Sequence, residues 1–205
     1  MIANMKRIYS HSHQIHRGFT LIELVVVLII LGILAVTALS RFINLNDEAT
    51  ESTVRYSAKA FKTSVDLANA AWAVKRLNVG IYNLSALPRS EDPNFAARGT
   101  SGVDVNANGW PAGIWEDWLA NAPADTPEDP SVYGAIGINN VQDCAQAWIG
   151  LMDSTQTVAR TANESGDYLA SHLGGQQCLY TYQDDTRYSF FYDAADGTVE
   201  YQFIP

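Results

Sequence analysis

The fold of this chain is decided by residues 17–39, which read RGFTLIELVVVLIILGILAVTAL. From Phe19 to Leu39 this run is almost wholly apolar. With a rise of about 1.5 Å per residue, a helix over the run is roughly 31 Å long, which matches the hydrocarbon thickness of a bilayer. The run therefore predicts a helix that spans a membrane.

One charge, Glu23, interrupts the apolar run. A carboxylate inside a membrane segment is costly unless it finds a partner, so its presence there indicates a function. The residues before the run include Lys6, Arg7 and Arg17 and no acidic residue. The positive-inside rule then places the N-terminus in the cytoplasm and everything after Arg41 across the membrane.

Two simpler interpretations compete with this one. The first is an ordinary signal peptide that is removed after the small residues at 35–38, AVTA, although the apolar run is long for such a peptide. The second is a plain single-span anchor, which leaves Glu23 without an explanation.

Residues 18–23, GFTLIE, behind a short basic leader resemble the class III signal of type IV prepilins. Residues 30–38 and 41–45 are similar to the MSHA (mannose-sensitive haemagglutinin) pilins. The resemblance implies that a prepilin peptidase cuts between Gly18 and Phe19 and then methylates the new Phe19 amine. It also implies that Glu23 pairs with the N-terminus of a neighbouring subunit during assembly. Ser40 stands where many type IV pilins have a helix-kinking proline.

The resemblance implies three parts of the chain. Residues 1–18 are a leader that the peptidase removes, with Met5 as an alternative start; residues 19–39 are a transmembrane and filament-core helix; residues 40–205 are a periplasmic or extracellular globular domain. The precursor is expected as a single-pass inner-membrane protein, and the mature chain in a filament on the cell surface. The implied partners are other pilin subunits, the peptidase and methyltransferase, the inner-membrane pilus assembly machinery, and the membrane before assembly.

The charge balance argues against nucleic acid as a partner. The chain has a net charge of −9. Loss of residues 1–18 removes three of the 13 basic residues and none of the 22 acidic ones, so the mature chain has a net charge of −12. A surface this acidic repels phosphate backbones.

Beyond the apolar run, a helix is predicted to continue to about Leu77 and to end near Gly80. Apolar residues recur there every three or four positions, which is typical of an amphipathic helix packed on one face; they are Val54, Ala58, Phe61, Val65, Ala68 and Trp72. We therefore expect one helix from about Leu21, whose second half packs on a β-sheet.

Residues 81–135 contain six prolines and read as a loop-rich region. Within it, Asp104, Asn106 and Asn108 precede Gly109 at the spacing of the first half of a calcium loop. The twelfth position is Trp115 instead of a glutamate, so an EF-hand is excluded. The alternatives are a calcium site of another geometry and a plain turn rich in Asp and Asn.

Three tryptophans, Trp110, Trp115 and Trp118, lie close together in the same region. Tryptophans beside acidic residues can form a contact patch for carbohydrate or protein. The alternative is a short helix from about Ile114 to Asn121 that its aromatic residues hold against the core.

A second helix is predicted from about Asn140 to Met152, because apolar residues again recur at helical spacing, with Cys144 on the buried face. Cys178 is the only other cysteine. Two cysteines on the oxidising side of a membrane most simply form one disulfide, which we expect to stabilise the domain by about 3–4 kcal/mol.

The C-terminal stretch is predicted to be a three-strand antiparallel meander. Its strands, Cys178–Tyr182, Arg187–Tyr192 and Thr198–Ile204, are rich in aromatic and β-branched residues, and turns at 184–186 and 193–197 separate them. The expected class is therefore α+β: a type IV pilin fold in which the long N-terminal helix packs on a C-terminal antiparallel sheet.

The sequence contains no nucleophile-elbow, P-loop or zinc-protease motif, so we expect no enzymatic activity and no catalytic residues. The function that the resemblance implies is that of an MSHA-like type IV pilus subunit for surface attachment, as a major or a minor pilin. The alternatives are a pseudopilin of a type II secretion system, and an envelope enzyme or carbohydrate-binding module with an atypical anchor. No cofactor is expected apart from the calcium considered above.

Overall fold

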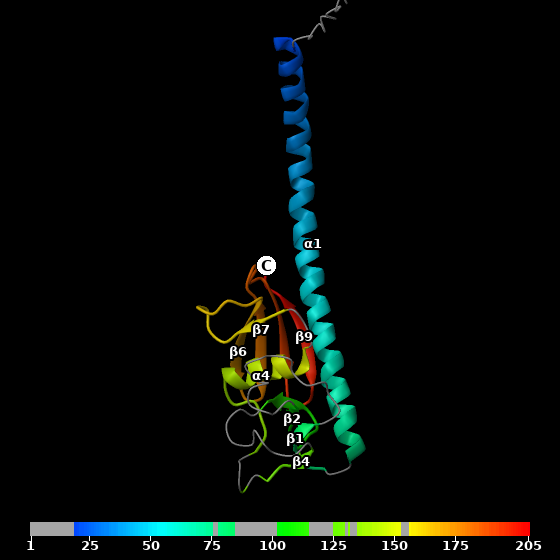
Figure 1. The fold of residues 1–205 in the computed structure, drawn as a ribbon, viewed down its shortest axis with the longest axis vertical. Coiled ribbons are helices and arrows are strands. Elements are labelled where there is room, and N and C mark those ends of the chain that lie inside the picture. The colour runs from blue at the N-terminus through cyan, green and yellow to red at the C-terminus, as the bar shows by residue number, and fades with distance from the viewer. Residues whose placement is uncertain are drawn as a thin grey trace, which may run out of the picture. The chain divides into compact units, whose positions relative to one another are not determined.

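The computed structural model describes residues 19–75, 78–84, 102–114, 125–129, 131, 135–152 and 156–205. The chain is divided into two compact units, Met1–Asn46 and Asp47–Pro205. The described part of the first unit is the beginning of helix α1 (Leu21–Lys75), and the second unit contains the rest of that helix and all of the strands (Figure 1). The predicted start of the helix at Leu21 is confirmed.

Helix α1 is helical throughout its length, including Gly32 and Ser40. No proline occurs before Pro88, so every backbone N–H in this stretch is able to join the helical ladder. The predicted end at Leu77 lies outside the described residues. Asn78 then adopts a positive φ of 51°, a left-handed conformation that asparagine tolerates, and the chain turns into strand β1 (Ile81–Leu84).

The amphipathic part of α1 packs as predicted. Its stripe of Val54, Ala58, Phe61, Val65 and Ala68 is buried, and Trp72 packs partly against the same core. Phe61 lies at the centre of an aromatic cluster, with its ring centroid between 5.2 and 6.2 Å from those of Trp148, Tyr180, Phe190 and Tyr192. These contacts hold this half of the helix against the C-terminal sheet.

The C-terminal sheet has five strands in the order β5-β6-β7-β8-β9. The predicted meander is confirmed as β7 (Gln177–Tyr182), β8 (Tyr188–Asp193) and β9 (Thr198–Phe203), which pair antiparallel. Edge strand β9 runs beside α1 (Figure 1), and the Arg55 guanidinium lies 4.0 Å from the centroid of the Tyr201 ring.

Two further strands of this sheet were not predicted. Strand β6 (Tyr168–Gly174) pairs antiparallel with β7, and the short β5 (Val158–Ala159) pairs parallel with β6. Tyr168 and Ala170 are buried while Leu169 and Ser171 are only half-buried, so β6 does carry the alternation of a strand.

The prediction of a loop-rich region at 81–135 was wrong in part, because its described residues form a second, antiparallel sheet. The order is β3-β2-β1-β4, with β2 at Val103–Val105, β3 at Pro111–Gly113 and β4 at Thr126–Pro127. Both strands that contain a proline are edge strands, where the missing N–H removes no ladder hydrogen bond. Prolines that read as loop signals are therefore compatible with this sheet.

Helix α4 (Val141–Leu151) confirms the predicted second helix. Asn140 is its N-cap, and the Asn140 side chain accepts hydrogen bonds from the backbone N–H groups of Gln142 and Asp143. One face of α4, including Trp148, is buried among the aromatic residues of the C-terminal sheet. The α+β class of the prediction is confirmed.

Candidate functional site

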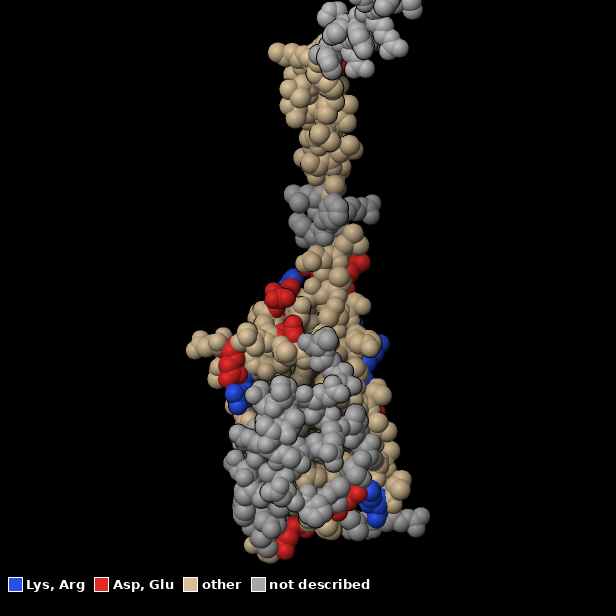
Figure 2. All heavy atoms as spheres, viewed as in Figure 1, with Lys and Arg blue, Asp and Glu red and all other residues tan. Residues whose placement is uncertain are grey.

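The first described segment of the chain is an apolar helix whose side chains are exposed in the structure. Residues Leu21–Ala38 are long and apolar enough to span a membrane, and none of this window is buried. Side chains such as Ile22, Leu28 and Ile33 are more than half exposed. Figure 2 shows the segment almost wholly in tan, the colour of uncharged residues. So large an apolar surface marks a region that lies in lipid or against other protein.

Thr20 and Glu23 form a reciprocal capping box at the start of this helix. The backbone N–H and the hydroxyl of Thr20 donate to Oε2 of Glu23 at 2.9 and 2.8 Å. The N–H of Glu23 donates back to the Thr20 hydroxyl at 3.3 Å. Each side chain thereby satisfies a backbone donor that the first turn of a helix leaves unpaired.

The Glu23 carboxylate already accepts two hydrogen bonds within the single chain, both from Thr20. Both bonds go to Oε2, and Oε1 makes no hydrogen bond within the described residues. The carboxylate thus retains one oxygen for a further donor. The predicted pairing of its charge with the N-terminus of a neighbouring subunit stays a prediction.

Comparison with known proteins identifies the stretch around this turn. The profile of the prokaryotic N-terminal methylation motif matches residues 14–39. The chain therefore carries a prepilin-type methylation motif. A curated relative, the type IV narrow pilus major component PilA5 of Thermus thermophilus, is 42% identical over 52 residues, which are 25% of this chain and 45% of the relative. The match therefore spans less than half the length of that relative, and no solved structure matches this chain.

The predicted processing residues lie at the start of the described chain. Phe19 is 78% exposed and directly precedes the capping box. Gly18 and the rest of the leader lie outside the described residues. Cleavage between Gly18 and Phe19, methylation of Phe19 and the registry role of Glu23 stay predictions at this point, although the motif match covers all three residues.

The predicted disulfide is confirmed. Cys144 of α4 and Cys178 of β7 are bonded, with their Cα atoms 5.6 Å apart, and both residues are fully buried. The Tyr180 hydroxyl also donates to the backbone carbonyl of Cys144 at 2.7 Å. Helix α4 is therefore fixed to the sheet at one residue by a covalent bond and by a hydrogen bond.

The three residues proposed for calcium all have protein partners. Asp104 accepts the Asn83 N–H, and the Asn106 oxygen accepts the N–H groups of Asn108 and Trp110. The amide nitrogens of Asn106 and Asn108 donate to the carbonyls of Ala194 and Ala195 respectively. The turn thus ties the second sheet to the β8–β9 connection, and calcium binding there stays a prediction. Among the described residues, no group of three or more His, Cys, Asp or Glu side chains is placed to hold a metal.

Of the three tryptophans, only Trp110 is described. It packs partly against the core, where its ring approaches Gly197 so closely that a Cβ there would lie 2.3 Å from the ring. The predicted patch and the short helix that includes Trp115 and Trp118 lie outside the described residues.

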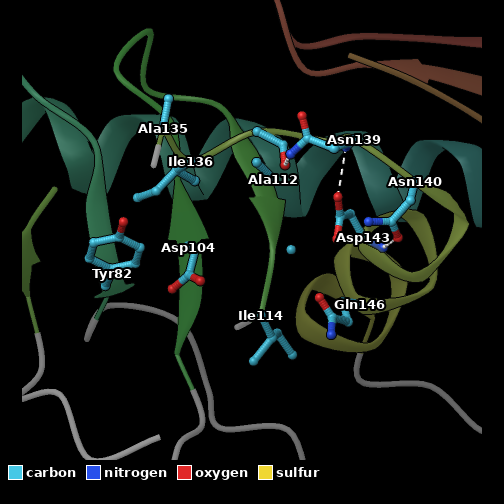
Figure 3. A pocket seen from close by; sticks show the side chains of 12 residues that line it. Tyr82, Asp104, Ala112, Ile114, Ala135, Ile136, Asn139, Asn140, Asp143 and Gln146 are labelled. Carbon is cyan, nitrogen blue, oxygen red and sulfur yellow. Dashed lines mark hydrogen bonds between the residues drawn. The ribbon is translucent and has the colours of Figure 1, made fainter. Parts of the chain in front are cut away.

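Sequence reasoning missed a cavity beside the start of α4. It is lined by Asp143 and Gln146 of α4, together with Asp104 of β2 and Tyr82 of β1 (Figure 3). Burial raises the pKa of the Asp143 carboxyl above its usual value, although the backbone N–H of Asn139 opposes the shift. The cavity is unrelated to the methylation motif and is considered further below.

Proposed function

We propose that this protein is a subunit of a type IV pilus of the MSHA kind that serves surface attachment, as a major or a minor pilin. The observation that carries the proposal is the unburied apolar helix with its single carboxylate, which lies within the residues that match the methylation motif. Members of the type IV pilin family are structural subunits, so we propose assembly and no catalysis.

The mechanism begins with burial of apolar surface. In the precursor, residues 21–38 lie in the bilayer, where their apolar side chains are in a favourable environment. On leaving the bilayer, each apolar helix must pack against those of other subunits, because transfer of apolar surface into water is unfavourable by roughly 25 cal/mol per Å². The filament core is then a bundle of these helices, and the globular units lie outside it.

The Glu23 carboxylate gives the bundle its register in this proposal. Its Oε2 atom holds the capping box, while Oε1 accepts the methylated N-terminal ammonium of a neighbouring subunit. A charged pair in an apolar core is favourable only when both partners are aligned. A subunit that is displaced along the bundle would leave both charges unpaired.

Processing and location follow from the same proposal. A prepilin peptidase removes residues 1–18 on the cytoplasmic side and methylates Phe19. The inner-membrane assembly machinery then extracts the mature chain into a filament on the cell surface. We propose no nucleic-acid partner for this protein.

Quantitative mass spectrometry of fibres sheared from the cell surface tests the proposal. We expect a chain that begins with N-methylated Phe19, at the abundance of the commonest fibre protein for a major pilin and at trace abundance for a minor one. A cytoplasmic-membrane protein that never enters fibres provides the control for contamination. Absence from the fibres, with processed chain in the envelope, would overturn the proposal and favour the secretion pseudopilin.

A further inference from the structure

A cavity of about 300 Å³ lies between strands β1, β2 and β3 and the first turns of α4. Figure 3 shows Asp143 and Gln146 reaching into it from α4, with Asp104 and Tyr82 on the opposite side. Ala112, Ile114 and Ile136 supply apolar parts of its wall. A volume of this size is at the lower end of the range for small-molecule sites.

Gln146 is the residue that indicates a binding site in this cavity. It is only 4% exposed, and its side-chain amide makes no hydrogen bond within the described residues. The residue is buried as a whole, but its amide atoms are not among the fully buried polar atoms, so in the free protein they contact water. The amide faces the cavity (Figure 3), so its partner belongs there.

Asp143 lies three residues before Gln146, on the same face of α4. One of its carboxylate oxygens accepts the Asn139 N–H at 2.6 Å, which is the dashed line in Figure 3. Neither lysine nor arginine occurs among the described lining residues, while two carboxylates do. The lining therefore favours a cation and disfavours an anion.

We propose that this cavity binds a small molecule that carries a primary ammonium group. The Asp143 carboxylate faces the ammonium, the Gln146 oxygen accepts one of its N–H groups, and the apolar wall contacts its hydrocarbon body. A neutral alcohol of the same shape forms the hydrogen bond to Gln146 without the charge attraction, and so binds more weakly. This site goes beyond the proposed assembly role, since it shares no residue with the apolar helix.

Three probes of one shape test the proposal on the full chain in detergent micelles: benzylamine, benzyl alcohol and benzoate. Titration by calorimetry or ligand-observed NMR is expected to show benzylamine binding at least about tenfold more tightly than benzyl alcohol, and no binding of benzoate. Equal binding of the amine and the alcohol, preference for benzoate, or binding of no probe would overturn the proposal.

Two variants locate the binding. Asp143→Asn keeps an oxygen for the Asn139 N–H and removes the charge, so benzylamine binding is expected to weaken about tenfold or more. Gln146→Leu removes the amide at similar volume and is expected to weaken it several-fold. The matched controls, Asp184→Asn and Gln202→Leu, make the same changes at positions outside the cavity and should bind as the parent chain does. If either cavity variant bound benzylamine as its control does, the assignment of that residue would be wrong.

Discussion

The Thr20 hydroxyl donates a hydrogen bond of 2.8 Å to the Glu23 carboxylate and accepts one of 3.3 Å from the Glu23 backbone N–H. The residue that is proposed to order the filament therefore also holds the first turn of the helix. Loss of Glu23 removes both contributions at once, so a simple alanine variant does not separate them.

Glu23→Gln separates the two contributions. Glutamine retains the capping box, because its side-chain oxygen also accepts from Thr20, but it carries no charge for a neighbouring ammonium. We expect normal leader cleavage, normal helix content and a decrease in fibre incorporation of about tenfold or more, as for loss of a charged hydrogen bond. Immunoblots of sheared fibres and of membranes measure incorporation and cleavage.

Thr20→Val is the control for this prediction. It removes the hydroxyl of the capping box and leaves the Glu23 charge, so incorporation should remain close to that of the parent chain. Normal incorporation of Glu23→Gln would show that the charge has no registry role.

Removal of the hydroxyl is expected to change the free energy of unfolding differently at two buried tyrosines. The Tyr168 hydroxyl is buried and has no hydrogen-bond partner within the described residues, whereas that of Tyr180 donates to the Cys144 carbonyl at 2.7 Å. Tyr168→Phe should leave the free energy of unfolding unchanged or raise it by up to about 1 kcal/mol, and Tyr180→Phe should lower it by roughly 1–2 kcal/mol. Denaturant titration of both variants checks the signs.

The same tyrosines predict a loss of stability at alkaline pH. Burial raises the pKa of Tyr168 from 10.0 to about 12, and burial also raises the pKa values of Tyr180 and Tyr192. Above pH 10 the unfolded chain releases these protons while the folded chain retains them, so the free energy of unfolding falls as the pH rises. Tyr168 alone accounts for on the order of 2–3 kcal/mol by pH 12.

Circular dichroism and tyrosinate absorbance, followed together between pH 9 and pH 12, measure this effect. We expect the buried tyrosines to ionise in the same transition that unfolds the sheet. In Tyr168→Phe the transition should move to higher pH. Ionisation of every tyrosine without unfolding would contradict the burial that the structure assigns.

The disulfide is expected to contribute to stability by an amount that rises with the logarithm of the length of the loop it closes. Cys144 and Cys178 are 34 residues apart, which corresponds to about 3–4 kcal/mol in the chain-entropy model. The Cys144→Ala, Cys178→Ala double variant should lose this amount in denaturant titration. Because both cysteines are fully buried, reductant should attack the native parent chain only slowly; fast reduction without unfolding would contradict that burial.

The elements that sequence reasoning predicted correctly are long and periodic. The stripe from Val54 to Ala68 repeats over four helical turns, and β7, β8 and β9 are six residues each with clear turns between them. The second sheet was missed because its strands have two to four residues, too few to display a period, and because Pro111 and Pro127 read as loop signals.

The cavity was beyond sequence reasoning for a different reason. Its wall brings Tyr82, Ile114 and Gln146 together from separate parts of the chain, and no pattern along the sequence records their proximity. Gln146 stands between Ala145 and Ala147 on a helix that reads as mostly buried, so nothing marks its amide as unpaired. The capping box, in contrast, is visible in the sequence, because Thr20 and Glu23 have the spacing that this motif requires.

The bond between Cys144 and Cys178 also limits how far the chain extends under load. When tension is applied at the two ends of the polypeptide, the force passes through the sulfur atoms, and the residues between the cysteines, 145–177, carry none of it. That segment includes β5 and β6. If it were free to extend, it would add roughly 120 Å to the length of the stretched chain, and the disulfide prevents this. A subunit pulled along a fibre therefore yields in its remaining parts first, while the 144–178 loop keeps its length.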